Sequence, residues 1–304
     1  MGRAIRIIEP QRLYFVTNRT QQGRLLLAPS REVNDLIGGV LGRALSLFEV
    51  EIFAFVFMSN HFHLIVRANE GQLSPFMSHL QGNIARELGR LIHWRGAFWE
   101  RRYSAEPILD DESYESRLAY LLSHGVKEGL VEKARQWPGL SCLPELTGSS
   151  PRSFPWIHRA ELCRRREKKP ELCERSCTTL YPVPLSVAPA WARMSQDLRC
   201  ERVKSLVRDG EKKASEQRAG RAVLGVKHLR RQRPHHRPRQ VKRSRRPLCH
   251  AATRSARQEY RQLYLRTVAV YRDCSHRFRS GEFGIEFPKY CYRPPLHYSS
   301  ERPT

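Results

Sequence analysis

The stretch that decides the fold is Phe57-Met58-Ser59-Asn60-His61-Phe62-His63-Leu64-Ile65-Val66. It predicts the turn and second strand of a β-hairpin whose first strand, residues 51–57, is rich in aromatic and β-branched side chains. Because successive side chains of a strand point to opposite faces, His61 and His63 share one face. Two imidazoles on a rigid strand form half of a metal site, although two histidines hydrogen-bonded on a solvated face give the same pattern.

The segments around the hairpin complete a regular order of elements. A strand at residues 13–17 and a helix that begins after the N-cap Ser30 precede it. A helix that opens at Ser74-Pro75 and runs to about Trp94, and then an extended segment ending near residue 109, follow it. Strand, helix, strand, strand, helix, strand is the split βαβ arrangement. We therefore expect an α+β fold, a ferredoxin-like antiparallel sheet with the histidine-bearing strand central and helices on one face.

A third helix supplies the second half of the candidate site. It begins with the acidic residues 110–112, which the helix dipole favours, and Gly125 is placed to end it. Its apolar face consists of Tyr114, Leu118, Leu121 and Leu122. Residues three and four apart share a face, so Arg117, Tyr120 and His124 form a separate polar stripe.

Three histidines and one tyrosine suggest phosphoryl chemistry. Imidazoles bind a divalent cation, but His61, His63 and His124 also suit zinc, nickel or copper, so ligand type does not fix the metal. A metal on a phosphate oxygen neutralises developing charge. Tyr120 would then attack phosphorus, and its phenolate is a tolerable leaving group for the reverse step. Its ordinary pKa of about 10 requires activation by the metal or a base.

Charge is concentrated in the second half of the chain. The net charge is +24, and residues 151–304 carry 37 Lys and Arg against 14 Asp and Glu, whereas residues 1–150 carry 17 against 16. Such a basic half indicates a polyanionic partner. We expect a catalytic domain at 1–147, a linker at 148–190 and a basic DNA-binding extension at 191–304. Within the extension, residues 191–226 and 260–271 are helical in pattern, and 229–246 is a basic tract expected to be extended.

Cysteine spacing and apolar runs bear on location. The eight cysteines include no Cys-x2-Cys pair, and no secretory segment is evident, so we expect reduced thiols. The longest apolar run, residues 52–58, is far shorter than the roughly 20 residues of a membrane span. We expect a cytoplasmic protein with no membrane partner.

Four ordered segments resemble one family. They are His61-Phe62-His63 after residues 56–60, then 98–103, then 119–131, and finally Trp137-Pro138-Gly139-Leu140-Ser141. In this order they resemble the HUH endonucleases in the form used by single-tyrosine, IS200-like transposases, specifically the REP-associated tyrosine transposases. The resemblance covers residues 10 to about 145.

The resemblance implies roles for these residues. Tyr120 would be the nucleophile, His61 and His63 metal ligands, and His124 the third ligand, where family members more often have Asn or Gln. The family uses Mg²⁺ or Mn²⁺, cuts single-stranded DNA near hairpins and leaves a 5′-phosphotyrosine. It implies a nucleoid-associated bacterial protein that acts on single-stranded or hairpin DNA as a monomer or homodimer.

Other interpretations remain open. Tyr103 and Tyr114 are rival nucleophiles, although both are expected to pack. The arginines expected along a DNA path, of which Arg86 and Arg90 lie with Asn83 off the buried stripe of their helix, are Arg86, Arg90, Arg101, Arg102, Arg117, Arg230, Arg231 and Arg233. The alternative enzymes are relaxases and replication-initiation nucleases of the same superfamily. From another class, the chain could be a catalytically inactive, domesticated DNA- or RNA-binding regulator.

Overall fold

A four-stranded antiparallel sheet organises the computed structural model, which describes residues 5–238 and 247–295. Its strands are β1 (Leu13–Arg19), β2 (Val50–Phe57), β3 (His61–Ala68) and β4 (Ser104–Ile108). The order β2-β3-β1-β4 places β3, which carries His61 and His63, inside the sheet between β2 and β1. The predicted ferredoxin-like fold with a central histidine-bearing strand is confirmed.

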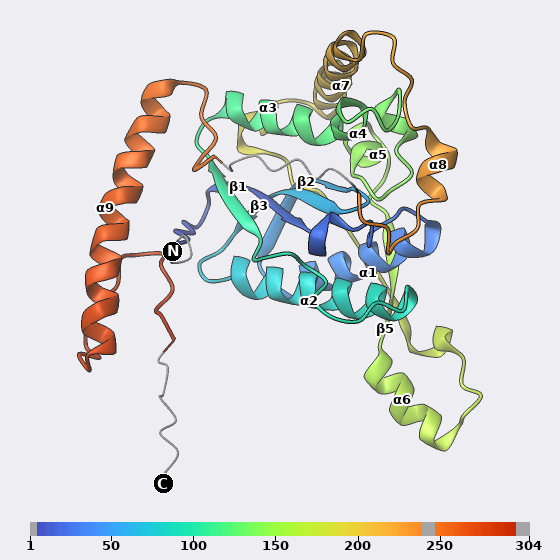
Figure 1. The fold of residues 1–304 in the computed structure, drawn as a ribbon, viewed down its shortest axis with the longest axis horizontal. Coiled ribbons are helices and arrows are strands. Elements are labelled where there is room, and N and C mark those ends of the chain that lie inside the picture. Colours follow the sequence, from blue (N-terminus) through green and yellow to red (C-terminus); the bar gives the residue numbers. More distant parts are fainter. Residues whose placement is uncertain (1–4, 239–246, 296–304) are drawn as a thin grey trace.

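Helices α1 (Arg31–Leu47) and α2 (Leu73–Leu91) cover one face of this sheet (Figure 1). Ser30 caps α1 as predicted, because its Oγ accepts a hydrogen bond from Val33 N at 3.1 Å. The predicted start of α2 at Ser74 is wrong by one residue, since the helix begins at Leu73 with Gln72 as its N-cap. Pro75 is tolerated there because amides in the first turn have no partner within the helix.

Helix α3 (Asp111–Leu122) lies on the opposite face (Figure 1). The ring of His63 packs against Tyr120 of this helix, and His61, two residues earlier on β3, shares that face. Asp110 caps it by accepting from Ser113 N at 2.8 Å. The expected single helix ends earlier than Gly125, because the backbone leaves helical geometry at Ser123 and a short helix, α4 (His124–Lys127), follows. The four predicted apolar residues of α3 are all buried.

Residues 148–190, expected to be a linker, contain regular structure, so that expectation is wrong. Strands β5 (Ser153–Ile157) and β6 (Thr178–Pro182) pair as an antiparallel hairpin, with α6 (Arg159–Lys168) between them. The hairpin packs on α1 at its glycines: a Cβ on Gly39 would lie 1.9 Å from the carbonyl oxygen of Pro155. The absence of a Cβ at Gly39 therefore lets the backbone of β5 approach α1 closely.

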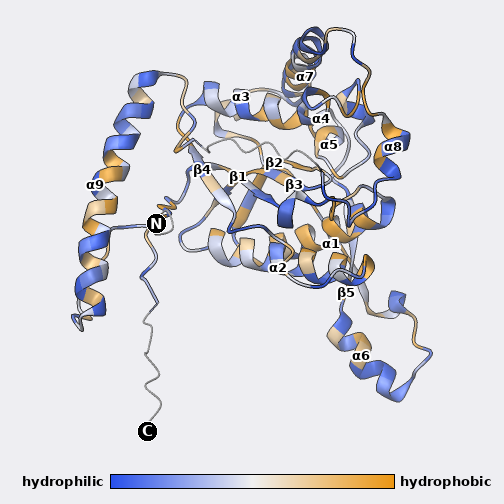
Figure 2. Ribbon diagram, viewed as in Figure 1, coloured by the Kyte–Doolittle hydropathy of each residue, from blue (hydrophilic) through white to orange (hydrophobic). Residues whose placement is uncertain are grey.

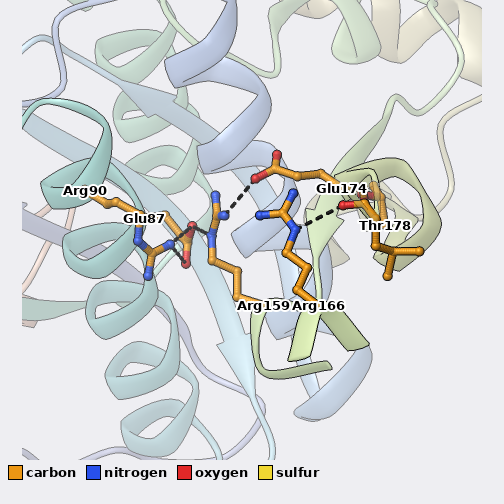
Figure 3. Close-up of polar contacts among 7 residues, drawn as sticks. Glu87, Arg90, Arg159, Arg166, Glu174 and Thr178 are labelled. Carbon is orange, nitrogen blue, oxygen red and sulfur yellow. Dashed lines mark hydrogen bonds and ion pairs between the residues drawn. The ribbon is translucent and has the colours of Figure 1, made fainter. Parts of the chain in front are cut away.

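A buried acid ties α6 to α2. The Glu87 carboxylate accepts from Arg159 Nε at 2.6 Å and from Arg90 Nη1 at 3.0 Å, and Arg159 also donates to Glu174 at 3.2 Å (Figure 3). Glu87 is 7% exposed, so two arginines neutralise a carboxylate that would otherwise be buried uncompensated.

The basic extension carries three further helices, α7 (Gln196–Arg218), α8 (Val226–Arg230) and α9 (Arg254–Arg279). The helical patterns at 191–226 and 260–271 are largely confirmed. The basic tract is not extended at its start, because Leu229 is fully buried within α8; residues 239–246 lie outside the described residues.

α6 and α9 project from the sheet and are largely hydrophilic (Figures 1 and 2). The remaining short elements are α5 (Leu143–Leu146) and 3-10 turns at Gln21–Gly23, Ala134–Gln136, Glu174–Cys177 and Pro189–Trp191.

Among the described residues, every helix is too short or too polar to cross a membrane.

Candidate metal centre and nucleophile

Three histidines converge between β3 and α4. His61 and His63 point from β3 toward the face covered by α3, and His124 opens α4 above them. His61 Nε2 lies 2.9 Å from His124 Nε2, and one ligand atom from each of the three residues lies within 4.8 Å of the others. This is the one such group of His, Cys, Asp and Glu side chains in the described part of the chain. The three predicted ligands are therefore brought together.

The donor set fits a divalent ion. Two imidazole nitrogens that bind one ion at about 2.1 Å and at right angles lie about 3 Å apart, as His61 and His124 do. Burial, followed by the neighbouring His124, lowers the pKa of His61 well below its usual range, which favours the neutral imidazole that binds metal. Three nitrogens fit several metals, so the geometry does not select one.

Tyr120 packs against the histidine cluster from one turn earlier in the chain. Its ring centroid lies 4.9 Å from that of His124 and 5.5 Å from that of His63. Although α3 ends at Ser123, the side chains of Tyr120 and His124 still contact each other, as their helical spacing predicts. Burial, and secondly Glu128, raise the pKa of the Tyr120 phenol, while Arg117 lowers it. The Arg117 guanidinium carbon lies 5.2 Å and Lys127 Nζ 4.6 Å from the tyrosine ring centroid.

The rival tyrosines lie elsewhere. Tyr114 is 2% exposed and packs edge-on against Trp191, and Tyr103 lies under the guanidinium of Arg6 at 3.6 Å. Burial raises the pKa of both phenols. Within the described residues, Tyr120 is the tyrosine whose ring packs against the cluster, through His63 and His124. The burial of Tyr103 and Tyr114 agrees with the expectation that both pack.

The structure reveals a second polar group beside the first. Glu106 on β4 pairs with His250 at 2.9 Å and accepts from Ser104 Oγ at 2.7 Å. Phe15 separates the groups: its ring stacks on His63 at 5.0 Å and meets His250 edge-on at 5.5 Å. Sequence reasoning missed both Glu106 and His250. Alternation along β4 could have placed Glu106 on this face, but no local signal joins it to a histidine 144 residues away.

The arginines expected along a DNA path divide into two groups. Arg86 and Arg90 lie on α2, on the far face of the sheet, where Arg86 donates to Asn83 at 2.7 Å and Arg90 pairs with Glu87. They are not brought to the histidines. Asn83 was expected outside the buried stripe of α2, but it is 8% exposed and therefore buried, which corrects that prediction.

The other arginines lie nearer the histidine cluster. The Arg117 guanidinium lies over the ring of Tyr120. The exposed Arg101 and Arg102 lie beside the end of β1 in space, because Asn18 Nδ2 donates to the carbonyl of Arg101 at 2.9 Å. Exposed Arg230, Arg231 and Arg233 flank Gln232, which accepts from Ser59 Oγ at 2.5 Å in the turn before His61. Arg19, which sequence reasoning did not single out, lies directly opposite His61 in the register of β1 and β3.

Comparison with known proteins gives a family match. Residues 27–123 match the family described as IS200-like transposases; this span contains His61, His63 and Tyr120 and ends one residue before His124. A structure of a REP-associated tyrosine transposase bound to a REP hairpin is 20% identical, with a TM-score of 0.42, over 48% of this chain and 85% of that one. A candidate transposase from Deinococcus radiodurans R1 is 21% identical, with a TM-score of 0.29, over 40% and 95%. No curated protein matches.

Proposed function

We infer the activity of this chain from the match of its residues 27–123 to the family of IS200-like transposases. Members of this family are DNA-cutting enzymes of transposition. We propose that this chain cuts and rejoins single-stranded DNA through a covalent bond between Tyr120 and a DNA phosphate. The observation that carries the proposal is the Tyr120 ring packed against the cluster of His61, His63 and His124.

In the proposed reaction the Tyr120 oxygen attacks a backbone phosphorus. The new bond joins this oxygen to phosphorus, the bond from phosphorus to the 3′ oxygen breaks, and that oxygen leaves as a hydroxyl after taking up a proton. The products are a 5′-phosphotyrosine and a free 3′-hydroxyl. Because one phosphodiester replaces another, a 3′-hydroxyl can reverse the step and rejoin DNA. The positive charges of Arg117 and Lys127 beside the ring favour the phenolate.

His61, His63 and His124 would hold the divalent ion, Mg²⁺ or Mn²⁺. When bound, the ion neutralises charge on the scissile phosphate and orients it. His124 stands where related enzymes more often carry Asn or Gln, and an imidazole is a competent replacement.

We propose that the DNA strand follows the edge formed by the Ser59-Asn60 turn and the end of β1. Arg101, Arg102, Arg230, Arg231 and Arg233 are exposed along or next to this edge. Phosphate contacts from several arginines give sequence-independent affinity. Arg86 and Arg90 are left out because both lie on the opposite face. The relative solved with a REP hairpin suggests a hairpin with a single-stranded flank as the substrate to try first.

The test is covalent capture. Purified protein is incubated with 5′- or 3′-labelled hairpin DNA and Mn²⁺, beside Tyr120→Phe and a chelator control. We expect a denaturation-resistant protein–DNA band that carries label from the 3′ side of the cut and disappears in both controls. A band that survives in Tyr120→Phe contradicts the assigned nucleophile. Tight binding to a broad hairpin panel without any band supports the alternative, an inactive DNA- or RNA-binding regulator.

A further inference from the structure

The helix α7 from the basic extension crosses the junction of α3 and α4 at very short range. A Cβ on Gly210 would lie 2.8 Å from both Cβ and Oγ of Ser123, closer than side chains normally approach. Ser123 is the residue at which α3 stops, between Tyr120 and His124. Figure 1 shows α7 against this end of α3. Glycine at position 210 therefore permits a helix contact directly behind the nucleophile and the third ligand.

Polar contacts fix α7 on either side of that crossing. On α3, Glu115 accepts from Trp191 Nε1 at 3.0 Å and pairs with Arg202 of α7. Beyond α4, Glu211 of α7 accepts from Ala134 N at 2.8 Å and pairs with Lys133 at 3.1 Å. The contacts lie before Tyr120 and after His124, so the whole segment between them is braced.

Apolar packing completes the contact. Val203, Val207 and Ala214 of α7 are buried in the same core as Leu118 and Leu122 of α3. The segment after α7 continues along the same region, since Leu224 N and Gly225 N donate to the carbonyls of Gly129 and Leu130 at 2.9 and 3.0 Å. The tyrosine-bearing helix thus lies between the sheet and the extension.

This brace matters because the site joins two separate elements. His61 and His63 belong to the sheet, while Tyr120 and His124 move with α3 and α4. A tilt of the helices changes the distance between these two halves without unfolding either. A displacement of about 1 Å at reacting groups can lower a rate roughly 100-fold.

We propose that α7 is a positioning helix that, through the Gly210–Ser123 contact, sets Tyr120 and His124 against His61 and His63. The proposal rests on the function proposed above. It gives residues 196–218 of the basic extension a role in turnover and metal binding that is separate from holding DNA. Gly210 and Glu115 are positioning residues, because neither contacts the histidine cluster.

The test adds one methyl group at the contact. Gly210→Ala is compared with Gly82→Ala, an exposed glycine of α2 whose Cβ would meet nothing within 4 Å. Alanine favours a helix over glycine in both variants, so intrinsic propensity is matched. Three readouts are taken: the single-turnover rate of adduct formation at saturating hairpin DNA and Mn²⁺, Mn²⁺ affinity without DNA by electron paramagnetic resonance, and hairpin affinity.

For Gly210→Ala we expect the adduct rate to fall about tenfold or more and Mn²⁺ affinity to fall several-fold, with hairpin affinity within about twofold. Gly82→Ala should match the parent in all three. Adding Ser123→Gly to Gly210→Ala removes the clashing Cβ and should restore both losses toward the level of Ser123→Gly alone. An unchanged rate and Mn²⁺ affinity in folded Gly210→Ala overturn the proposal, as does a double variant no better than Gly210→Ala.

Glu115→Ala provides a second route if Gly210→Ala does not fold. It removes the contacts to Trp191 and Arg202 without adding atoms, and the same selective losses are expected; parent-like turnover and Mn²⁺ affinity overturn the proposal. Failure of the proposed function is separate, because it appears as a parent protein that forms no Tyr120-dependent adduct. Mn²⁺ affinity still tests the positioning role in that case.

Discussion

His61 Nε2 and His124 Nε2 lie 2.9 Å apart although 63 residues separate them in the chain. His61 belongs to the sheet, and His124 belongs to the short helix α4 on the same face of the sheet as α3. Both come from one chain, as does Tyr120. The histidine cluster is therefore a product of tertiary packing, and its properties should depend equally on the strand and on the helix.

Metal affinity should follow the number of nitrogen ligands. His61→Ala and His124→Ala each leave two imidazoles, and we expect Mn²⁺ affinity to fall by roughly tenfold or more, since even losing a residue that supports a ligand weakens binding by that much. His124→Gln offers an oxygen in place of nitrogen and should retain most of the adduct-forming activity. Titration calorimetry and the adduct assay measure the two effects. Equal affinity in the parent and His124→Ala would exclude His124 as a ligand.

One chain should be sufficient for cleavage. Because His61, His63, His124 and Tyr120 of the same chain lie together, a mixture of His61→Ala and Tyr120→Phe should remain as inactive as either variant alone. The mixture is assayed for adduct after long co-incubation, beside the parent at equal total concentration. Activity that appears only in the mixture would mean that the tyrosine acts on a site in a second copy.

Arg117 should assist the nucleophile by its charge. Arg117 lowers the pKa of the Tyr120 phenol, so Arg117→Met should raise that pKa and slow adduct formation by about tenfold for each unit of the rise. Arg86→Met is the matched control, an arginine of α2 on the far face of the sheet. Single-turnover rates at saturating hairpin DNA separate this effect from binding. Equal rates in the two variants would remove Arg117 from the mechanism.

The strand path should be visible in the salt dependence of binding. Replacing both Arg231 and Arg233 by Ala should reduce the slope of log affinity against log salt, by about 0.7 for each lost contact to a single strand. Replacing Arg86 and Arg90 together should leave the slope unchanged, because they lie on the other face. Fluorescence anisotropy over a salt series gives the slopes. The reverse pattern would place the DNA across α2.

The β5–β6 hairpin should contribute to stability through its seat on α1. Gly39→Ala brings a methyl group against the Pro155 carbonyl, and we expect it to lower the free energy of unfolding by about 1–3 kcal/mol. Gly82→Ala, in open space, should instead stabilise by about 1 kcal/mol. Urea denaturation compares the two. A neutral Gly39→Ala would show that the hairpin shifts freely on the helix.

Local patterns were enough to predict the sheet, the central place of its histidine-bearing strand and the three histidines. Alternation placed His61 and His63 on one face, and helical spacing placed His124 beside Tyr120. The glycines of α1 indicated close packing but not its partner, so residues 148–190 were wrongly expected to be a linker. The Glu106–His250 pair and the Gly210–Ser123 contact join residues far apart in the chain. Neither leaves a periodic or spacing signal in a single sequence.

Mapping the DNA attachment site by mass spectrometry identifies which tyrosine forms the bond to DNA. Trypsin releases Tyr120 in the peptide 118–127 and both rivals, Tyr103 and Tyr114, in the peptide 103–117. After cleavage of hairpin DNA with Mn²⁺, nuclease trimming and tryptic digestion, we predict a nucleotide phosphate on peptide 118–127, fragmenting at Tyr120. A nucleotide on peptide 103–117, or cleaved DNA with no modified peptide, would contradict Tyr120 as the nucleophile.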